Sequence, residues 1–356
     1  MDAYEKLARH LDALPNGFPL TESGVERRLL AKIFSPEEAE LAAKLRLTLE
    51  TPAQVAERLG GDAQEMRRRL KDMAIKGLIA VERGETGLVF GALPFVVGIY
   101  ENQIGSFDLE LAQLFEAYYK EAYGRELSLR PQIHRVIPVE ETVRTGTEIR
   151  PYESAAEIIA QAKAWGVLDC ICRVQKKLLG EPCPHPIDVC MAFSQMPGSF
   201  DKHPDIRAQT QDESLATLRR AAEAGLVHSV SNSQQGVTYI CNCCTCACGI
   251  LRGLADLGIA DVVARSPFVA QVIEEDCVGC DLCLDRCQFS ALTLDGVAHI
   301  DSQRCVGCGV CAVACPEGAL VLVRRDASEA VDPPLDVSEW RRERARATGR
   351  DLEAVL

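Results

Sequence analysis

Two cysteine runs near the end of the chain have spacings suited to metal chemistry. They read Cys277-x2-Cys280-x2-Cys283-x3-Cys287 and Cys305-x2-Cys308-x2-Cys311-x3-Cys315-Pro316. Thiolates are soft ligands that select zinc, Cu(I) or iron–sulfur clusters. Two intervening residues let the chain curl around one corner of a cubane, so that successive sulfurs reach different irons. We therefore interpret both runs as [4Fe–4S] ligands, in preference to zinc ribbons or buried free thiols.

The doubled run resembles the two-cluster bacterial ferredoxins over about residues 271–325. This resemblance implies that the fourth cysteine of each run crosses to the other cluster. The first cluster would be held by Cys277, Cys280, Cys283 and Cys315, and the second by Cys305, Cys308, Cys311 and Cys287. Gln288 stands where the family usually has a proline, which shapes the turn and binds no iron. The acidic character of this segment favours docking to basic patches on redox partner proteins.

Nine further cysteines precede the ferredoxin-like segment. They are Cys170, Cys172, Cys183, Cys190, Cys241, Cys243, Cys244, Cys246 and Cys248. Exposed thiols oxidise readily, so we expect metal binding here rather than nine inert thiols, and the iron–sulfur neighbour favours one or two more clusters over zinc. We predict a [4Fe–4S] cluster on Cys172, Cys183, Cys190 and either Cys170 or Cys241. The thiols of 241–248 would hold a second centre or lend ligands to the first.

The surroundings of these thiols add three expectations. Residues i and i+2 of an extended chain share a face, so Cys170 and Cys172 would face one metal. His185, between two prolines, is expected to donate a hydrogen bond to a cluster sulfur, and His228 to be a core residue. The order of motifs over about residues 95–325 resembles a group of iron–sulfur proteins from anaerobic microbes. That resemblance implies anaerobic redox metabolism and gives no substrate.

Residues 1–100 contain no cysteine and show helical patterns. Ser35-Pro36 and Thr51-Pro52 have the form of helix starts, and a further helix is expected from Asp62 to about Lys76. A hairpin is expected over 77–90, so residues 20–95 resemble a winged helix-turn-helix domain. The resemblance implies that Arg67, Arg68, Arg69 and Lys71 contact DNA phosphates. Basic and acidic side chains nearly cancel in this region, which favours a scaffold role instead.

Composition limits the class of protein. The chain has 356 residues, 17 cysteines and a net charge of −13, which argues against broad nucleic-acid affinity. An odd cysteine count and the lack of a secretory leader predict a reducing, cytoplasmic location. The longest apolar run, 88–100, is too short to span a membrane. We expect an α+β protein with a winged-helix-like domain (1–100), a mixed cysteine-rich domain (101–265), a two-cluster ferredoxin domain (266–325) and a helical tail (326–356).

These patterns predict a multi-cluster protein that relays single electrons between a redox partner and the cysteine-rich middle region. The alternative is a redox- or oxygen-responsive regulator that binds DNA through the winged helix. No nucleotide, flavin or hydrolase motif is found, so whether the chain is an oxidoreductase component stays open. The expected partners are redox proteins, with assembly as a homo-oligomer or complex subunit also open.

Overall fold

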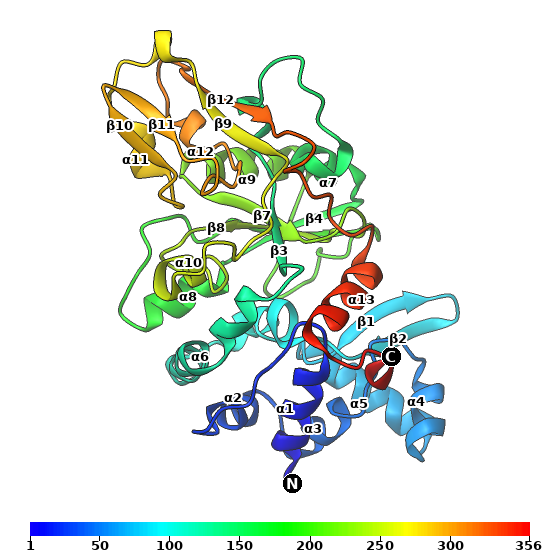
Figure 1. Ribbon diagram of the computed structural model, residues 1–356. Coiled ribbons are helices and arrows are strands. Elements are labelled where there is room, and N and C mark those ends of the chain that lie inside the picture. Colours follow the sequence, from blue (N-terminus) through cyan, green and yellow to red (C-terminus); the bar gives the residue numbers. More distant parts are fainter. The chain divides into compact units, whose positions relative to one another are not determined.

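The computed structural model describes residues 1–356, which form two compact units (Figure 1). Unit 1 comprises Met1–Arg130 and Arg341–Leu356, and unit 2 comprises Pro131–Trp340. Both units combine helices with antiparallel strands, in agreement with the predicted α+β class. The four predicted domains, with boundaries after residues 100, 265 and 325, stay a prediction.

Unit 1 is mainly helical. Its elements are α1 (Ala3–Ala13), α2 (Val25–Ile33), α3 (Pro36–Ala42), α4 (Pro52–Leu59), α5 (Ala63–Ile75), β1 (Ala80–Gly84), β2 (Gly87–Gly91), α6 (Leu109–Glu121) and most of α13 (Val337–Thr348). Ser35 and Thr51 each form a capping box with the residue three positions later, which confirms both predicted helix starts. Asp62 is the N-cap residue of α5. The hairpin β1–β2 follows α5, with Ala80 paired to Gly91.

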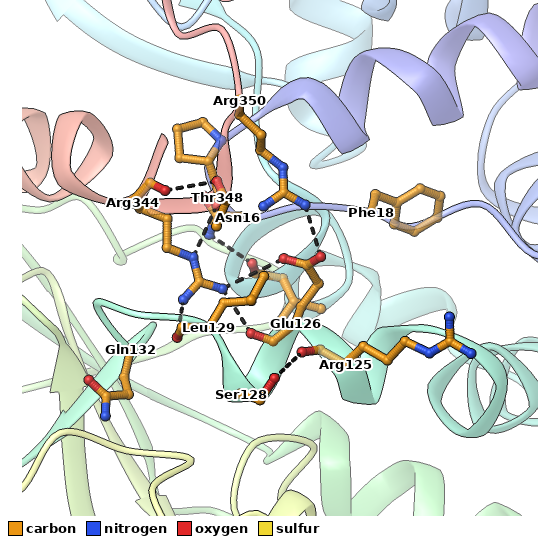
Figure 2. A network of polar contacts seen from close by, with 12 residues as sticks. Asn16, Phe18, Arg125, Glu126, Ser128, Leu129, Gln132, Arg344, Thr348 and Arg350 are labelled. Carbon is orange, nitrogen blue, oxygen red and sulfur yellow. Dashed lines mark hydrogen bonds and ion pairs between the residues drawn. The ribbon is translucent and has the colours of Figure 1, made fainter. Parts of the chain in front are cut away.

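A buried arginine attaches α13 to the rest of unit 1 (Figure 2). The Arg344 guanidinium donates hydrogen bonds to the carbonyl oxygens of Pro15, Glu126 and Leu129. Arg350 donates to the carboxylate of Glu126 over 2.8 Å. The predicted C-terminal tail thus contains a helix, and Arg344 of that helix bonds within its own chain.

Unit 2 is built on a six-stranded antiparallel sheet with the strand order β3-β7-β8-β5-β4-β6. Its elements are β3 (His134–Val136), α7 (Ala155–Gln161), β4 (Ala164–Leu168), α8 (Ile171–Leu178), β5 (Cys190–Ser194), β6 (Arg207–Gln209), α9 (Gln211–Glu223), β7 (Val227–Ser231), β8 (Tyr239–Cys243), α10 (Arg252–Leu257), β9 (Phe268–Val272), α11 (Leu282–Arg286), β10 (Leu292–Asp295), β11 (Val297–Ile300), α12 (Val310–Val313) and β12 (Leu320–Arg324). The pairs β9–β12 and β10–β11 form two smaller antiparallel sheets.

The core of unit 2 lies between its large sheet and the helices α7 and α9. It includes the apolar side chains of Ile158, Ile159, Met191, Phe193, Val230 and Ile240, with Leu215 and Leu218 packed against them. No helix of the structure is long and apolar enough to cross a membrane.

Local backbone geometry sets the ends of two helices in unit 2. Residues 151–153 form a 3-10 turn, and α7 begins after it with Ser154 as its cap. The helix α10 stops at Leu257. Gly258 follows with a φ of 67°, a left-handed conformation that ends a helix at little cost for glycine.

Candidate metal centres

The two C-terminal cysteine runs form matching loops, each followed by a short helix, α11 or α12. Both loops have the sequence Cys-Val-Gly-Cys, and the glycines Gly279 and Gly307 have φ values of 69° and 71°. A side chain at Gly307 would place its Cβ 2.0 Å from the carbonyl oxygen of Phe268. Glycine therefore permits both the turn and the close approach of β9 to the cysteine loop.

Four of these thiols come together from both runs around one cavity. Cys277, Cys280, Cys283 and Cys315 line it with Leu294, Ala298, Ala319 and Leu320. Burial raises the pKa of Cys283, and the charges of Cys315, Cys280 and Cys277 raise it further. The first expected ligand set is thus brought together, including the fourth cysteine from the other run.

The other four thiols of the runs also interact with one another. Burial raises the pKa of Cys308 to about 12, with contributions from Cys305 and Cys287. The pKa of Cys311 is raised in the same way, mainly by burial and then by Cys308, Cys305 and Cys287. Cys283 of the first set also acts on Cys311, so the two sets are neighbours.

Both sets suit a cluster of positively charged irons. Buried thiols with raised pKa values ionise at a cost unless a cation offsets their charge. Backbone N–H groups point at three of the sulfurs, from Ala298 to Cys277, from Ala291 to Cys287 and from Ala270 to Cys305, over 3.3–3.5 Å. Such hydrogen bonds stabilise cluster-bound thiolates.

Six of the nine middle thiols form a second group, in which three thiols are buried and three are partly exposed. Its members are Cys170, Cys172, Cys190, Cys241, Cys243 and Cys248. Hydrogen bonding to Cys170, together with burial, holds the pKa values of Cys172 and Cys190 well above the usual range. The sulfurs of Cys243 and Cys248 are 3.3 Å apart.

Cys170 and Cys172 meet for a reason other than the predicted one. Cys170 is extended as the N-cap of α8, but Cys172 lies in the first turn of that helix, so the two residues do not belong to one extended segment. Their side chains nevertheless interact, and Cys170 also reaches Cys190 at the start of β5.

The remaining three middle thiols gather around a histidine. The Cys183 sulfur lies 3.1 Å from Cys246, 3.6 Å from Cys244 and 3.2 Å from Nδ1 of His185. The thiolates raise the pKa of His185 to about 9, with Cys183 the larger influence and Cys244 the next. Hydrogen bonds from Cys244 and Cys246 lower the pKa of Cys183 far below its usual range.

This arrangement differs from the predicted grouping, which joined Cys183 to Cys172 and Cys190. The loop after α8 carries Cys183 to the turn that follows β8, where Cys244 and Cys246 lie. That pairing joins segments about sixty residues apart, and spacing along the chain does not reveal it. His185 contacts thiol sulfurs as expected, while His228 is buried and pairs with Asn242.

Two residues near the thiols make contacts that the sequence did not predict. Arg173, buried in α8, donates hydrogen bonds to the Asn242 carbonyl oxygen over 2.8 Å and to the Cys244 sulfur over 3.4 Å. Gln288 donates to the Gly225 carbonyl oxygen and accepts from the Thr245 N–H over 2.7 Å. The sequence signal for these contacts was the glutamine at a position where the ferredoxin family usually has proline, because a side-chain amide can form hydrogen bonds that proline cannot.

Comparison with protein families matches residues 297–320 to a family described as a 4Fe-4S binding domain. The match contains Cys305, Cys308, Cys311 and Cys315. No curated protein and no solved structure matches the chain. The family match and the gathered cysteines support an iron–sulfur protein.

Proposed function

We propose that this chain is an electron-transfer protein with two [4Fe–4S] clusters on its C-terminal cysteines and further metal–thiolate centres among residues 170–248. The observation that carries the proposal is the formation of two neighbouring four-thiol sets, each with three cysteines from one run and one from the other. When bound, such clusters supply one-electron redox chemistry. The proposal places the protein in a reducing cytoplasm and in anaerobic metabolism, with a redox protein as partner.

The chain's own residues would set the conditions for that chemistry. The N–H groups of Ala270, Ala291 and Ala298 stabilise sulfur charge, which raises the reduction potential of the group they contact. The apolar side chains Leu294 and Leu320 line the first thiol set and limit the access of water. Cys283 and Cys311 lie close enough to interact, so an electron would have a short path between the two sets.

A path also leads from the second set toward the middle thiols. Gln288 follows Cys287 in the chain, and its side chain accepts the N–H of Thr245, which lies between Cys244 and Cys246. Arg173 then joins Cys244 to the strand that carries Cys243. We propose that the six-thiol group holds a further iron–sulfur centre and exchanges electrons with the C-terminal clusters along this route.

Substitution of Cys287, which is expected to bind the cluster of the other run, tests the two-cluster part of the proposal. Cys287→Ser should remove the cluster held by Cys305, Cys308 and Cys311 and spare the other, because Cys287 belongs to the second set. Iron and sulfide analysis of anaerobically purified protein, with electron paramagnetic resonance of the reduced state, measures this loss. Cys280→Ser is the matched control: it changes the same run but should remove the first cluster.

The assignment fails if Cys287→Ser damages only the cluster held by its own run. In that case each run would hold its own cluster, and the two variants would give the same spectrum.

A second candidate function rests on the arrangement of α4, α5 and the β1–β2 hairpin, which is similar to a winged helix. Arg67 and Arg68 are exposed on α5, as a DNA-contacting helix requires. However, Arg68 forms an ion pair with Glu65, and Arg69 donates to the carbonyl oxygen of Glu37. These partners reduce the charge available for phosphates, so we favour electron transfer.

A further inference from the structure

Cys183, His185, Cys244 and Cys246 form a compact set of four metal-ligating side chains. Their ligand atoms all lie within 4.8 Å of one another. The set has two arms, a Cys-x-His loop after α8 and a Cys-x-Cys turn after β8. It shares no residue with the six-thiol group or with either of the C-terminal sets.

The separations between these atoms suit one ion. In a tetrahedral site with zinc–sulfur bonds of about 2.3 Å, the sulfurs lie roughly 3.8 Å apart. The observed sulfur separations are 3.1, 3.2 and 3.6 Å, and Nδ1 of His185 lies 3.2 and 3.7 Å from two of these sulfurs. A cubane attaches its four thiolates to four different irons, with the cluster core between them, so it needs wider spacing.

We propose that these three thiolates and one imidazole bind a single zinc ion. Three sulfurs and one nitrogen are a donor set that zinc commonly takes in tetrahedral sites. The proposal goes beyond the electron-transfer function, because zinc has no redox chemistry and would hold the two arms together rather than carry electrons.

The surroundings support a built metal site. Pro182, Pro184 and Pro186 restrict the backbone on both sides of the Cys183 arm. Arg173 donates to the Cys244 sulfur from a buried position, which is the kind of outer hydrogen bond that orients a metal ligand. The fourth ligand is the imidazole of His185, which already contacts the Cys183 sulfur, so the four side chains need to move little to bind an ion.

The site borders a cavity of about 1120 Å³, which makes the ion accessible. His185, Cys244 and Cys246 line one part of this cavity, and Cys287 and Phe289 line another. Cys246 is exposed, whereas Cys244 is buried. A chelator or a competing metal can therefore reach the ion without unfolding the chain.

Metal analysis of the full-length protein tests the proposal. After anaerobic reconstitution with iron, sulfide and zinc, the wild type should hold about one tightly bound zinc per chain. His185→Ala and Cys246→Ser should lose it and keep the iron and sulfide of the other sites. His299→Ala is the matched control, because His299 is exposed and lies outside every thiol group.

Cobalt(II) provides an optical readout of the same site. Cobalt should give the visible absorption of a tetrahedral thiolate complex in the wild type and in His299→Ala, and lose it in His185→Ala. His185→Cys should restore the bands with a shift, because a fourth sulfur replaces nitrogen.

Two results would overturn the proposal. Loss of iron and sulfide in His185→Ala, with zinc absent from the wild type, would make the set part of an iron–sulfur cluster. Unchanged zinc in both variants would place the ion elsewhere. Neither result touches the C-terminal clusters, whose failure would appear as missing iron in the wild type itself.

Discussion

At the level of single residues, Gln288 joins the C-terminal cysteine segment to the Cys244–Cys246 turn. Its amide bonds both the Gly225 carbonyl oxygen and the Thr245 N–H. Gln288→Ala should lower the free energy of unfolding by about 1–3 kcal/mol, since it leaves a partly buried N–H and carbonyl without their partner. Denaturant unfolding of the metal-loaded protein measures the change.

Two further substitutions separate the contributions of the two hydrogen bonds of Gln288 to stability. Gln288→Glu keeps an acceptor for Thr245 and loses the donor for Gly225, so it should lie between wild type and Gln288→Ala. Gln288→Pro, the residue of the ferredoxin family, should resemble Gln288→Ala. If the proline variant is as stable as the wild type, the bonds of Gln288 contribute nothing.

His134 gives the protein a dependence on pH. The ring is buried beside Tyr239 and Ser229, and burial lowers its pKa from 6.5 to about 4. Between these pH values the unfolded chain binds a proton that the folded chain does not. Titration of this ring therefore leaves the free energy of unfolding unchanged above pH 6.5. As the pH drops from 6.5 toward 4, the free energy of unfolding falls by up to about 1.4 kcal/mol per pH unit.

His134→Gln should reduce the slope of this part of the pH profile, and the rest of the slope should remain because burial also lowers the pKa of His228 to about 4. Denaturant unfolding between pH 7 and 5 measures the slope in the variant and in the wild type. His299→Gln is the control, because it makes the same substitution at an exposed position. Equal slopes in wild type and His134→Gln would mean that the ring does not titrate in this way.

Arg344 is the residue on which the attachment of α13 within unit 1 depends. Its guanidinium is buried, bonds three carbonyl oxygens and lies 3.6 Å from the Glu126 carboxylate. Arg344→Met should destabilise unit 1 by about 3–5 kcal/mol, because it leaves three carbonyl oxygens without their donor and Glu126 with Arg350 as its remaining cationic partner. Thermal unfolding measures this, with the exposed Arg342→Met as control.

At the level of elements, local signals predicted α3, α4 and α5 well. Ser35, Thr51 and Asp62 cap these helices through bonds to residues two or three positions away, and such bonds are readable from sequence. The six-stranded sheet was not predicted, because its order joins β3 to β7 and β4 to β6 across long stretches of chain. The partners of Cys183 could not be predicted for the same reason, whereas the regular cysteine spacing of 277–315 resembles two-cluster ferredoxins, and that resemblance implied which of these thiols lie together.

The exposed face of α5 tests the regulator hypothesis. Changing Arg67, Arg68 and Arg69 together to Ala should leave metal content and electron transfer unchanged, because two of these arginines already bond within unit 1. Gel-shift titration of wild type and variant against DNA fragments measures any affinity. A salt-dependent, sequence-selective affinity that disappears in the variant would favour the regulator instead.

At the level of the whole molecule, the cysteines are confined to one unit. All 17 lie between residues 170 and 315, within unit 2, and unit 1 has none. Removal of metal under reducing conditions should therefore weaken unit 2 selectively, since metal binding contributes to the folding of the loops that hold it. Hydrogen exchange should show lost amide protection around β8 and α11, with α1–α6 unchanged.

A uniform loss of protection would contradict this expectation, because it would mean that unit 1 cannot fold without the metals. Reloading iron and zinc without oxygen should restore the protection in unit 2.

Unit 1 is completed by residues 341–356, which follow unit 2 in the chain, and this has a consequence for biosynthesis. A ribosome makes the chain from its N-terminus, so the whole of unit 2 is synthesised before Arg344 and Arg350 are added. Until then Glu126 lacks both of the arginines that it binds in the finished protein. Cofactor delivery to the nascent thiols can thus precede the closing of unit 1, and a stop codon just after Trp340 would release a chain with complete metal ligands and an unfinished helical unit.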